Sequence, residues 1–205
     1  VTIQANRTLV HKGEMVGYRC AAVNRGTASM ADITLRCGEE TATARNLAPG
    51  DGLPLDGVVR AEGELNLTVN AIASGPDGSE LADEASLQID VVSPDLKVEV
   101  HKDPEAICRG QRVSIAVRLE NSGDDPLSDV RVSDDLGEIG GVLVLEPGEA
   151  RTLMRNSTVD ESLEDVVRVV AIDSTGSRLY RSMTLNLDLL EPGLNLTVDP
   201  GNAAA

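Results

Sequence analysis

Aromatic residues are almost absent: there is no Phe and no Trp, and only Tyr18 and Tyr180 occur among 205 residues. The core must therefore be built from Val, Leu, Ile and Ala, and the flat rings that stack on bases, sugars or quaternary amines are missing. Basic residues are also scarce, because 18 Lys and Arg stand against 34 Asp and Glu, a formal net charge of −16. This balance excludes nucleic acid and anionic membrane surfaces as expected partners, since both require a basic face.

The sequence also has few signals of catalysis. His11 and His101 are the only histidines, and neither lies in a metal-ligand or nucleophile motif. No glycine-rich phosphate loop leads into a helix, and no carboxylate pair is singled out as an acid and a base. No apolar run is long enough to span a bilayer. We therefore expect a protein that is not an enzyme, has no cofactor, and has no membrane span in this chain.

An internal repeat organises the sequence. Two segments align without a gap at an offset of 97, and the matched pairs include Val1 with Val98, Ile3 with Val100, Gly13 with Gly110, Asn24 with Asn121, and Asp32 with Asp129. Further along, Leu47 to Gly50 aligns with Leu145 to Gly148, and Val69 to Ser74 aligns with Val169 to Ser174 at an offset of 100. The sequence therefore predicts two copies of one module, at residues 1–93 and 94–191.

The opening of a third copy follows the second module. Residues Pro94-Asp95-Leu96-Lys97-Val98 recur as Pro192-Gly193-Leu194-Asn195-Leu196. We expect residues 192–205 to be the opening strand of a third repeat with a tail, as in a window cut from a longer tandem array. The alternative is that this strand is exchanged, and completes the sheet of a neighbouring subunit by strand addition.

Each module has the pattern of β-strands. Val113, Ile115, Val117 and Leu119 are apolar at period two with polar or small residues between them, which indicates a strand with one buried face. Turn clusters such as Asn121-Ser-Gly123 separate the strands. About seven short strands per module predict an all-β fold of two tandem immunoglobulin-like β-sandwiches.

The second module resembles a known family of repeats. Asn121-Ser-Gly123 ends one strand, Pro126-Leu127 opens the next, and Leu145-Glu-Pro-Gly-Glu149 forms a later corner. This pattern resembles immunoglobulin-like repeats of prokaryotic cell-surface proteins, which include the cell-adhesion-related CARDB domain and the S-layer-like repeats of archaea. The first module departs from the pattern, because Ser29-Met30 replaces the Pro-Leu step and two Cys are added.

The resemblance implies a non-catalytic extracellular structural repeat of a cell-surface protein, such as a stalk, S-layer or filament element. Two alternatives are an adhesive or ligand-binding module and an accessory domain of a larger surface enzyme. The expected partners are neighbouring repeats or copies of the chain itself, and other surface proteins or glycans.

Three cysteines are present, Cys20, Cys37 and Cys108. Cys20 lies on the same strand face as Tyr18, and Cys37 follows Leu35 at period two, so both are expected to point inward. They would form either a disulfide across the core or two buried free thiols. Closing a loop of about seventeen residues would contribute about 3 kcal/mol. Cys108 is left as a single thiol.

Four Asn-x-Ser/Thr triplets are candidate N-glycosylation sites, which require a surface Asn in an exported chain. In the strand-like segments 65–69 and 194–198, Asn and Thr alternate with Leu, which favours an outward position for both. The candidate Asn residues are Asn6, Asn66, Asn156 and Asn195.

Acidic residues of the second module fall on turns and strand ends, where converging oxygen ligands would hold Ca²⁺. No EF-hand or nonapeptide calcium pattern is present, so solvated turns are the alternative. The candidate ligands are Asp124, Asp125, Asp129, Asp134 and Asp135.

Overall fold

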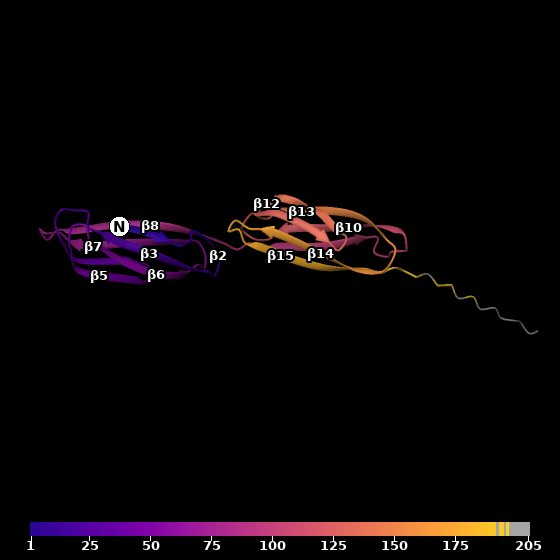
Figure 1. Cartoon of the computed structure of the whole chain (residues 1–205), viewed down its shortest axis with the longest axis horizontal. Coiled ribbons are helices and arrows are strands. Elements are labelled where there is room, and N and C mark those ends of the chain that lie inside the picture. The colour runs from indigo at the N-terminus through magenta and orange to yellow at the C-terminus, as the bar shows by residue number, and fades with distance from the viewer. Residues whose placement is uncertain (192, 195, 197–205) are drawn as a thin grey trace, which may run out of the picture. The chain divides into compact units, whose positions relative to one another are not determined.

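The computed structural model describes residues 1–191, 193–194 and 196, which form strands and turns without a helix. It divides into two compact units, unit 1 at Val1–Pro94 and unit 2 at Asp95–Ala205 (Figure 1). The all-β fold class is the one expected from the alternating pattern. The expected opening strand of a third repeat, at residues 192–205, lies almost wholly outside the described residues.

Unit 1 is a sandwich of a three-stranded sheet and a five-stranded sheet. The smaller sheet has the order β1-β3-β6, and the larger has the order β2-β8-β7-β4-β5. The strands are β1 (Thr2–Ala5), β2 (Leu9–His11), β3 (Met15–Val23), β4 (Met30–Cys37), β5 (Glu40–Leu47), β6 (Gly52–Arg60), β7 (Leu65–Ser74) and β8 (Glu80–Val92).

Unit 2 has a three-stranded sheet of order β13-β10-β9 and a four-stranded sheet of order β12-β11-β14-β15. A parallel bridge between Ile107 and Leu189 takes the place of the short β2 of unit 1. The strands are β9 (Leu96–Asp103), β10 (Gln111–Asn121), β11 (Leu127–Asp134), β12 (Gly137–Leu145), β13 (Ala150–Val159), β14 (Leu163–Ile172) and β15 (Arg178–Leu187).

Both units share one immunoglobulin-like topology. In each, the first strand begins in the smaller sheet and its continuation pairs in parallel with the last strand of the larger sheet. A constant-type immunoglobulin domain pairs its fourth strand within the sheet of its first two strands. Here β5 and β12 pair instead with β4 and β11, in the sheet that holds the last two strands. Two sandwiches of the same strand order therefore repeat along the chain.

The strand register corrects one part of the sequence alignment. Ala31 lies opposite Ser74 in unit 1, and its counterpart Ser128 lies opposite Ile172 in unit 2. Ser74 therefore corresponds to Ile172 at an offset of 98, and its alignment with Ser174 is wrong by two residues. A shift of two leaves the inward and outward alternation of a strand unchanged, so the apolar pattern does not detect it.

A β-bulge recurs near the start of β4 in unit 1 and of β11 in unit 2. Asp32 and Asp129 both have φ 47°, and the register with the neighbouring strand shifts at these residues. Asp is one of the few side chains that tolerates this left-handed conformation. The matched aspartates in the sequence thus mark a backbone feature that both modules keep.

A buried asparagine fastens the same corner in each unit. Asn121 is fully buried, and its side-chain amide donates to the carbonyls of Asp125 at 2.8 Å and Leu145 at 2.9 Å. Its side-chain oxygen accepts the N–H of Gly123 at 3.1 Å. Asn24 makes the matching three bonds in unit 1, to Ala28 O, Leu47 O and Gly26 N. This network explains why Asn-x-Gly and Leu-x-Pro-Gly recur together: one side chain joins the two turns.

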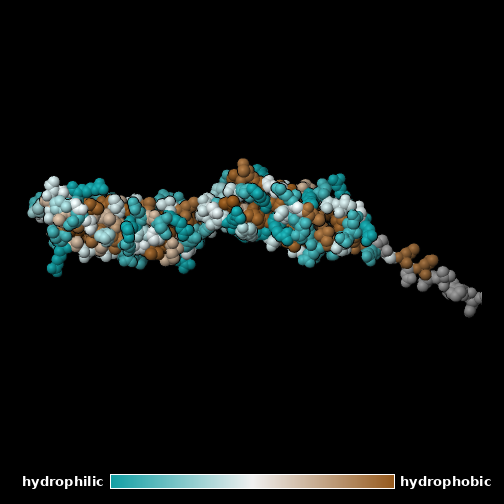
Figure 2. Space-filling model, in the orientation of Figure 1, coloured by the Kyte–Doolittle hydropathy of each residue, from teal (hydrophilic) through white to brown (hydrophobic). Residues whose placement is uncertain are grey.

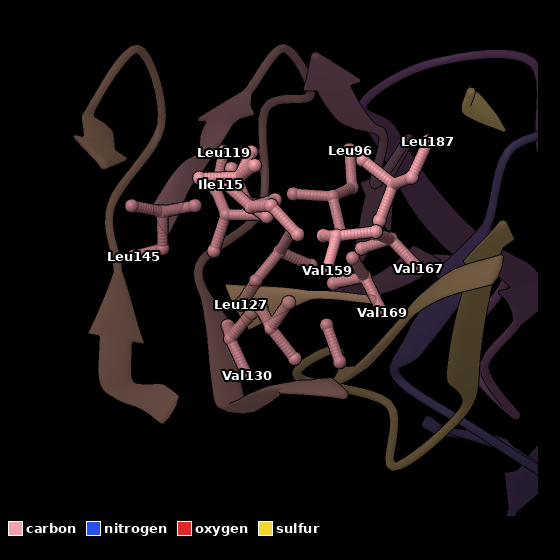
Figure 3. Packing of buried hydrophobic residues seen from close by; sticks show 14 of the residues in the cluster. Leu96, Ile115, Leu119, Leu127, Val130, Leu145, Val159, Val167, Val169 and Leu187 are labelled. Carbon is pink, nitrogen blue, oxygen red and sulfur yellow. The ribbon is translucent and has the colours of Figure 1, made fainter. Parts of the chain in front are cut away.

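The core of unit 2 is one continuous cluster of aliphatic side chains from both sheets (Figure 3). Ile115 and Leu119 come from β10, and Leu127 and Val130 come from β11 in the opposite sheet. Burying each such side chain contributes about 1.5–3 kcal/mol. The buried members are Leu96, Ile107, Val113, Ile115, Val117, Leu119, Leu127, Val130, Val132, Leu145, Val159, Val167, Val169, Ala171 and Leu187.

The core of unit 1 is thinner and divided. Its smaller cluster consists of Ile33, Leu47 and Ala73. The larger cluster includes both Cys20 and Cys37, and its buried members are Val10, Val16, Tyr18, Cys20, Ala22, Leu35, Cys37, Leu55, Ala61, Leu67, Val69 and Ile89. Several positions that carry Leu or Val in unit 2 carry Ala in unit 1, so less apolar area is removed from water.

The buried asparagine gives a first prediction. Asn121→Ala and Asn24→Ala should each lower the free energy of unfolding of their own unit by about 3 kcal/mol, because buried carbonyl and N–H groups lose their partners. Asn70→Ala, at an exposed position of β7, is the control and should change stability by less than about 0.5 kcal/mol. Urea unfolding followed by circular dichroism measures the difference, and equal stability of all three variants would contradict the role of the corner.

Candidate functional site

In each unit, one side-chain interaction joins the two sheets at the end of β4 in unit 1 and of β11 in unit 2. In unit 1 this link is covalent: Cys20 on β3 and Cys37 at the end of β4 are both fully buried and form a disulfide, with Cα atoms 6.8 Å apart. The bond joins the smaller sheet to the larger one. It lies in the divided core of unit 1, where Ala22 stands in the place of Leu119 of unit 2.

Tyr18 covers the disulfide end of unit 1. Its hydroxyl donates to the backbone carbonyl of Cys37 at 3.0 Å, and burial raises the pKa of the phenol. Gly57 lies opposite Tyr18 on β6, and a Cβ there would overlap the Tyr18 ring. The absence of a side chain at Gly57 is therefore what allows the ring to lie flat across the strand.

Unit 2 replaces this arrangement with an ion pair. Asp134 is the counterpart of Cys37, Ile115 of Tyr18, and Arg155 of Gly57, as the pairing of Ile115 with Arg155 shows. Arg155 on β13 donates to Asp134 at the end of β11 at 2.5 Å, and the Asp134 side chain is fully buried. Both links therefore join the smaller sheet to the larger sheet at the end of β4 or β11. The link of unit 1 is a disulfide from β3, and the link of unit 2 is an ion pair from β13, the counterpart of β6.

A second buried carboxyl lies next to this pair. Asp165 on β14 is fully buried, and its Oδ1 accepts the N–H of Asp135 at 3.1 Å. Its Oδ2 and the Oδ2 of Asp134 are both buried without a hydrogen-bond partner. Burial raises the pKa of Asp165, and the charges of Asp134 and Asp135 raise it further. Asp165 is the counterpart of Leu67 in unit 1, so this position holds a carboxyl where the repeat otherwise holds an apolar residue.

The pKa of Asp135, the residue after Asp134, is shifted in the opposite direction to that of Asp165. Arg168 donates to its Oδ1 at 2.7 Å, and the N–H of Val166 donates to its Oδ2 at 3.1 Å. The hydrogen bond from Arg168 holds the pKa of Asp135 below its usual range. Three carboxyls and two guanidiniums therefore lie together near the end of β11, and they belong to Asp134, Asp135, Asp165, Arg155 and Arg168.

The proposed calcium ligands do not come together. Asp125 lies before β11, where its carboxylate accepts the N–H of Ser174 at 2.8 Å and the hydroxyl of Ser174 at 2.5 Å. Asp134 and Asp135 lie at the other end of that strand, and 8 residues at about 3.3 Å each separate the two groups by about 25 Å.

The remaining candidate ligands have other roles. Asp124 is exposed, and Asp129 forms the bulge and pairs with Arg131 at 2.9 Å. In the described part of the chain, no three His, Cys, Asp or Glu side chains gather as a metal site would need. The five candidate ligands are therefore not gathered at one place, because those before β11 and those at its end are about 25 Å apart along the strand.

The candidate glycosylation sites that the structure describes are on the surface. Asn6, Asn66 and Asn156 are all exposed, and Asn66 alternates with the buried Leu67 on β7. Asn156 lies on β13, at the edge of its sheet. Asn195 lies outside the described residues.

The other candidate residues form no site. His11, on β2 of unit 1, lies 3.7 Å from Glu14, and His101 is exposed on β9 of unit 2. Cys108 is an exposed free cysteine. A shallow hollow of about 480 Å³ on unit 2 is lined by Arg131, Glu138 and Arg178 among others, with charges of both signs and no aromatic side chain. Apolar side chains are scattered among hydrophilic ones over the face that Figure 2 shows. The described residues contain no helix that could span a membrane.

Comparisons with known proteins give distant likenesses only. No family model and no curated protein matches the sequence. Fibronectin(III)-like modules of Clostridium thermocellum CbhA align at 15% identity over 96% of this chain and 100% of theirs, with a TM-score of 0.33.

Two further solved structures are similarly distant. A tetra-tandem repeat from the extending region of a large adhesion protein aligns at 18% identity over 92% of this chain and 49% of that chain, with a TM-score of 0.36. Red sea bream transglutaminase aligns at 13% identity over 91% of this chain and 31% of that chain, with a TM-score of 0.33. Because each TM-score is below 0.5, these likenesses transfer no ligand, partner or activity to this chain.

The buried carboxyl gives a prediction on pH. The raised pKa of Asp165 means that the unfolded chain ionises first as pH rises, so stability is lost from about pH 4 up to the folded-state pKa. Asp165→Asn keeps the Oδ1 acceptor and removes the charge, so it should stabilise unit 2 at pH 7 by about 1 kcal/mol, and by less at pH 4.

Asp135→Asn is the matched control, because the pKa of Asp135 is lowered. Its contribution is present above the unfolded pKa and is lost as pH falls, so this variant should be less stable at pH 7 and closer to the native chain at low pH. Thermal melting between pH 4 and pH 8 measures both. A loss of stability at every pH with Asp165→Asn would contradict the proposed cost of the buried charge.

Proposed function

We propose that this chain is a structural segment of an extracellular cell-surface protein, in which tandem sandwich modules build a stalk, S-layer or filament. The observation that carries the proposal is the repetition itself. The same strand order, the same bulge at Asp32 and Asp129, and the same corner at Asn24 and Asn121 occur twice in one chain. Repeated self-contained modules, each with its own core, add length to a chain one unit at a time, which is what an extended surface protein needs.

Three properties support an extracellular place. The buried Cys20–Cys37 bond belongs to an oxidising compartment, because disulfides are kept reduced in most cytosols. The net charge of −16 keeps neighbouring chains hydrated and apart. The exposed Asn6, Asn66 and Asn156 are accessible acceptors for glycans. The resemblance of the second module to CARDB and archaeal S-layer-like repeats points the same way.

A structural segment must resist tension, and the two inter-sheet links bear on this role. In unit 1 a pulled chain meets a covalent bond at Cys20 and Cys37, whereas unit 2 relies on the ion pair of Asp134 with Arg155. The partners that this role implies are neighbouring repeats or further copies of the chain. No cofactor and no catalytic residue is part of the proposal.

Single-molecule stretching tests the role. The chain should unfold in two separate events, one for each unit. The disulfide shields the segment between two cysteines that are 17 positions apart, so reduction should lengthen the unit 1 event by about 60 Å and leave the unit 2 event unchanged. Cys37→Ser should give the longer event without reductant. A chain that extends without separate events, or a unit 1 event that reduction does not lengthen, would contradict the proposal.

Glycan attachment is a separate prediction. In a host that glycosylates exported chains, Asn66 and Asn156 should carry glycans, because their side chains are exposed and their triplets are complete. Thr68→Ala and Thr158→Ala should each remove one glycan mass from the intact protein. Asn70→Gln, at an exposed Asn outside any triplet, is the control. An intact mass equal to that of the bare polypeptide would refute the prediction.

A further inference from the structure

Gly17 lies in the middle of a strand where the packing of the protein does not account for it. It is on β3, the central strand of the smaller sheet of unit 1. A Cβ at Gly17 would meet only Asn6 among the described residues, at 3.9 Å, which is an ordinary van der Waals contact. Gly57 in the same sheet is different, because a Cβ there would overlap Tyr18.

The backbone at Gly17 does not require glycine either. Gly17 is not among the glycines with a positive φ, and the register of β3 with β6 runs through it without a shift. Glycine weakens the interior of a strand, and besides bulges and bends it marks places that a ligand or another backbone approaches closely. A group outside the polypeptide is therefore the remaining reason for an open space here.

The missing side chain leaves a shallow hollow of about 340 Å³ on the surface of unit 1, called here the Asn6 hollow. Sites for small ligands begin at about 300 Å³. Gln4, Asn6, Gly17 and the ion pair of Arg19 with Asp56 are among its lining, and Arg19 Nε lies 2.6 Å from Asp56 Oδ1. Both side chains of this pair are exposed, so the hollow offers N–H donors and carboxylate oxygens to a polar group.

The acceptor atom of a candidate glycosylation site lies at this hollow. The backbone N–H of Asn6 donates to the carbonyl of Gly17 at 2.9 Å, which places the two residues opposite each other just beyond β1. The side-chain nitrogen Nδ2 of Asn6 is 3.9 Å from the position that a Gly17 Cβ would take. An N-linked sugar is attached through this nitrogen. A sugar on Asn6 therefore starts beside the open space over Gly17.

Unit 2 places a candidate Asn in the same row of its smaller sheet. Ser114 is the counterpart of Gly17 on the central strand β10, and Asn156 on β13 lies opposite it. The Ser114 hydroxyl is buried and has no hydrogen-bond partner in the part of the chain that the structure describes. Each module thus has a candidate Asn beside a small residue of its central strand. Asn66 is different, because it lies opposite Gln88 in the larger sheet.

We propose that the first sugar of a glycan on Asn6 lies in the Asn6 hollow, across β3 and over Gly17. Val58 pairs with Gly17 on β6 and is 62% exposed, so it offers an apolar surface to the C–H face of the sugar ring. Arg19 and Asp56 face the hydroxyls. The sugar is a hexose or an N-acetylhexosamine, and it packs on the sheet as the missing side chain would.

This inference rests on the glycan acceptors proposed above and adds the place where one sugar sits. The test uses two chains that are secreted from a glycosylating host and trimmed by an endoglycosidase to one N-acetylglucosamine. One chain keeps only the Asn6 triplet, through Asn66→Gln, Asn156→Gln and Asn195→Gln. The other keeps only the Asn66 triplet, with Asn6→Gln in place of Asn66→Gln. Intact mass gives the occupancy of each site.

Calorimetry then measures the melting temperature of unit 1, whose transition is the one that reduction of the Cys20–Cys37 disulfide lowers. The sugar on Asn6 should raise this temperature by about 4 °C, because it packs against the folded sheet. The sugar on Asn66, which has no such hollow in this proposal, should change it by less than about 1 °C.

Gly17→Val fills the hollow and separates packing from mere attachment. Without sugar this variant should be at least as stable as the native chain, since a β-branched residue suits a strand and its Cβ meets no close contact. With sugar on Asn6, the gain of about 4 °C should fall below about 1 °C. In the chain with sugar on Asn66, the effect of the sugar should be the same with and without Gly17→Val.

Nuclear Overhauser contacts locate the sugar directly, and the ring protons should contact the Val58 methyl groups. An equal gain from the Asn6 sugar with and without Gly17→Val overturns the proposal. A sugar-free chain that Gly17→Val destabilises also overturns it, because the protein itself would then require the glycine. Asn6 left bare in the native chain beside an occupied Asn66 overturns the seat alone. A native chain that is bare at every triplet contradicts the glycan prediction and this inference with it.

Discussion

A core built almost entirely of small and aliphatic side chains is the constraint on which this structure depends. Phe and Trp are absent, and among the described residues only Tyr18 contributes an aromatic ring to a buried cluster, where its hydroxyl reaches from β3 to the Cys37 carbonyl in the opposite sheet. The sheets are therefore held by many small apolar contacts together with a few specific links. The buried amides of Asn24 and Asn121 fasten the corners, and one link joins the sheets at the other end of β4 and of β11.

The two modules solve the same problem with different chemistry. Unit 1 has the smaller core, with Ala22 where unit 2 has Leu119, and a disulfide joins its sheets. Unit 2 has the continuous core, and the buried pair of Asp134 with Arg155 takes the place of the covalent bond. A buried ion pair is weak support for stability, because desolvation of both charges offsets their attraction. The continuous core of unit 2 thus contains the costlier link, and the divided core of unit 1 contains the covalent one.

The sequence predicted the features that depend on local pattern. Alternation at Val113, Ile115, Val117 and Leu119 gave a strand with one buried face, and the offset of 97 matched Asn24 with Asn121. Cys20 and Cys37 were expected to point inward on neighbouring strands, and the structure places them in contact. The candidate calcium ligands are not brought together, because acidic residues that are near in sequence lie at opposite ends of β11.

The sequence by itself determined the fold class and the repetition, because alternation and turn residues act over a few positions and are written in the chain. Tertiary structure decided two things that depend on long-range pairing. It set the offset of β7 and β14 at 98, since a shift of two preserves alternation. It brought Arg155 to Asp134 from another sheet. Neither could be read from the pattern along one strand, because both depend on which strands lie beside or opposite one another.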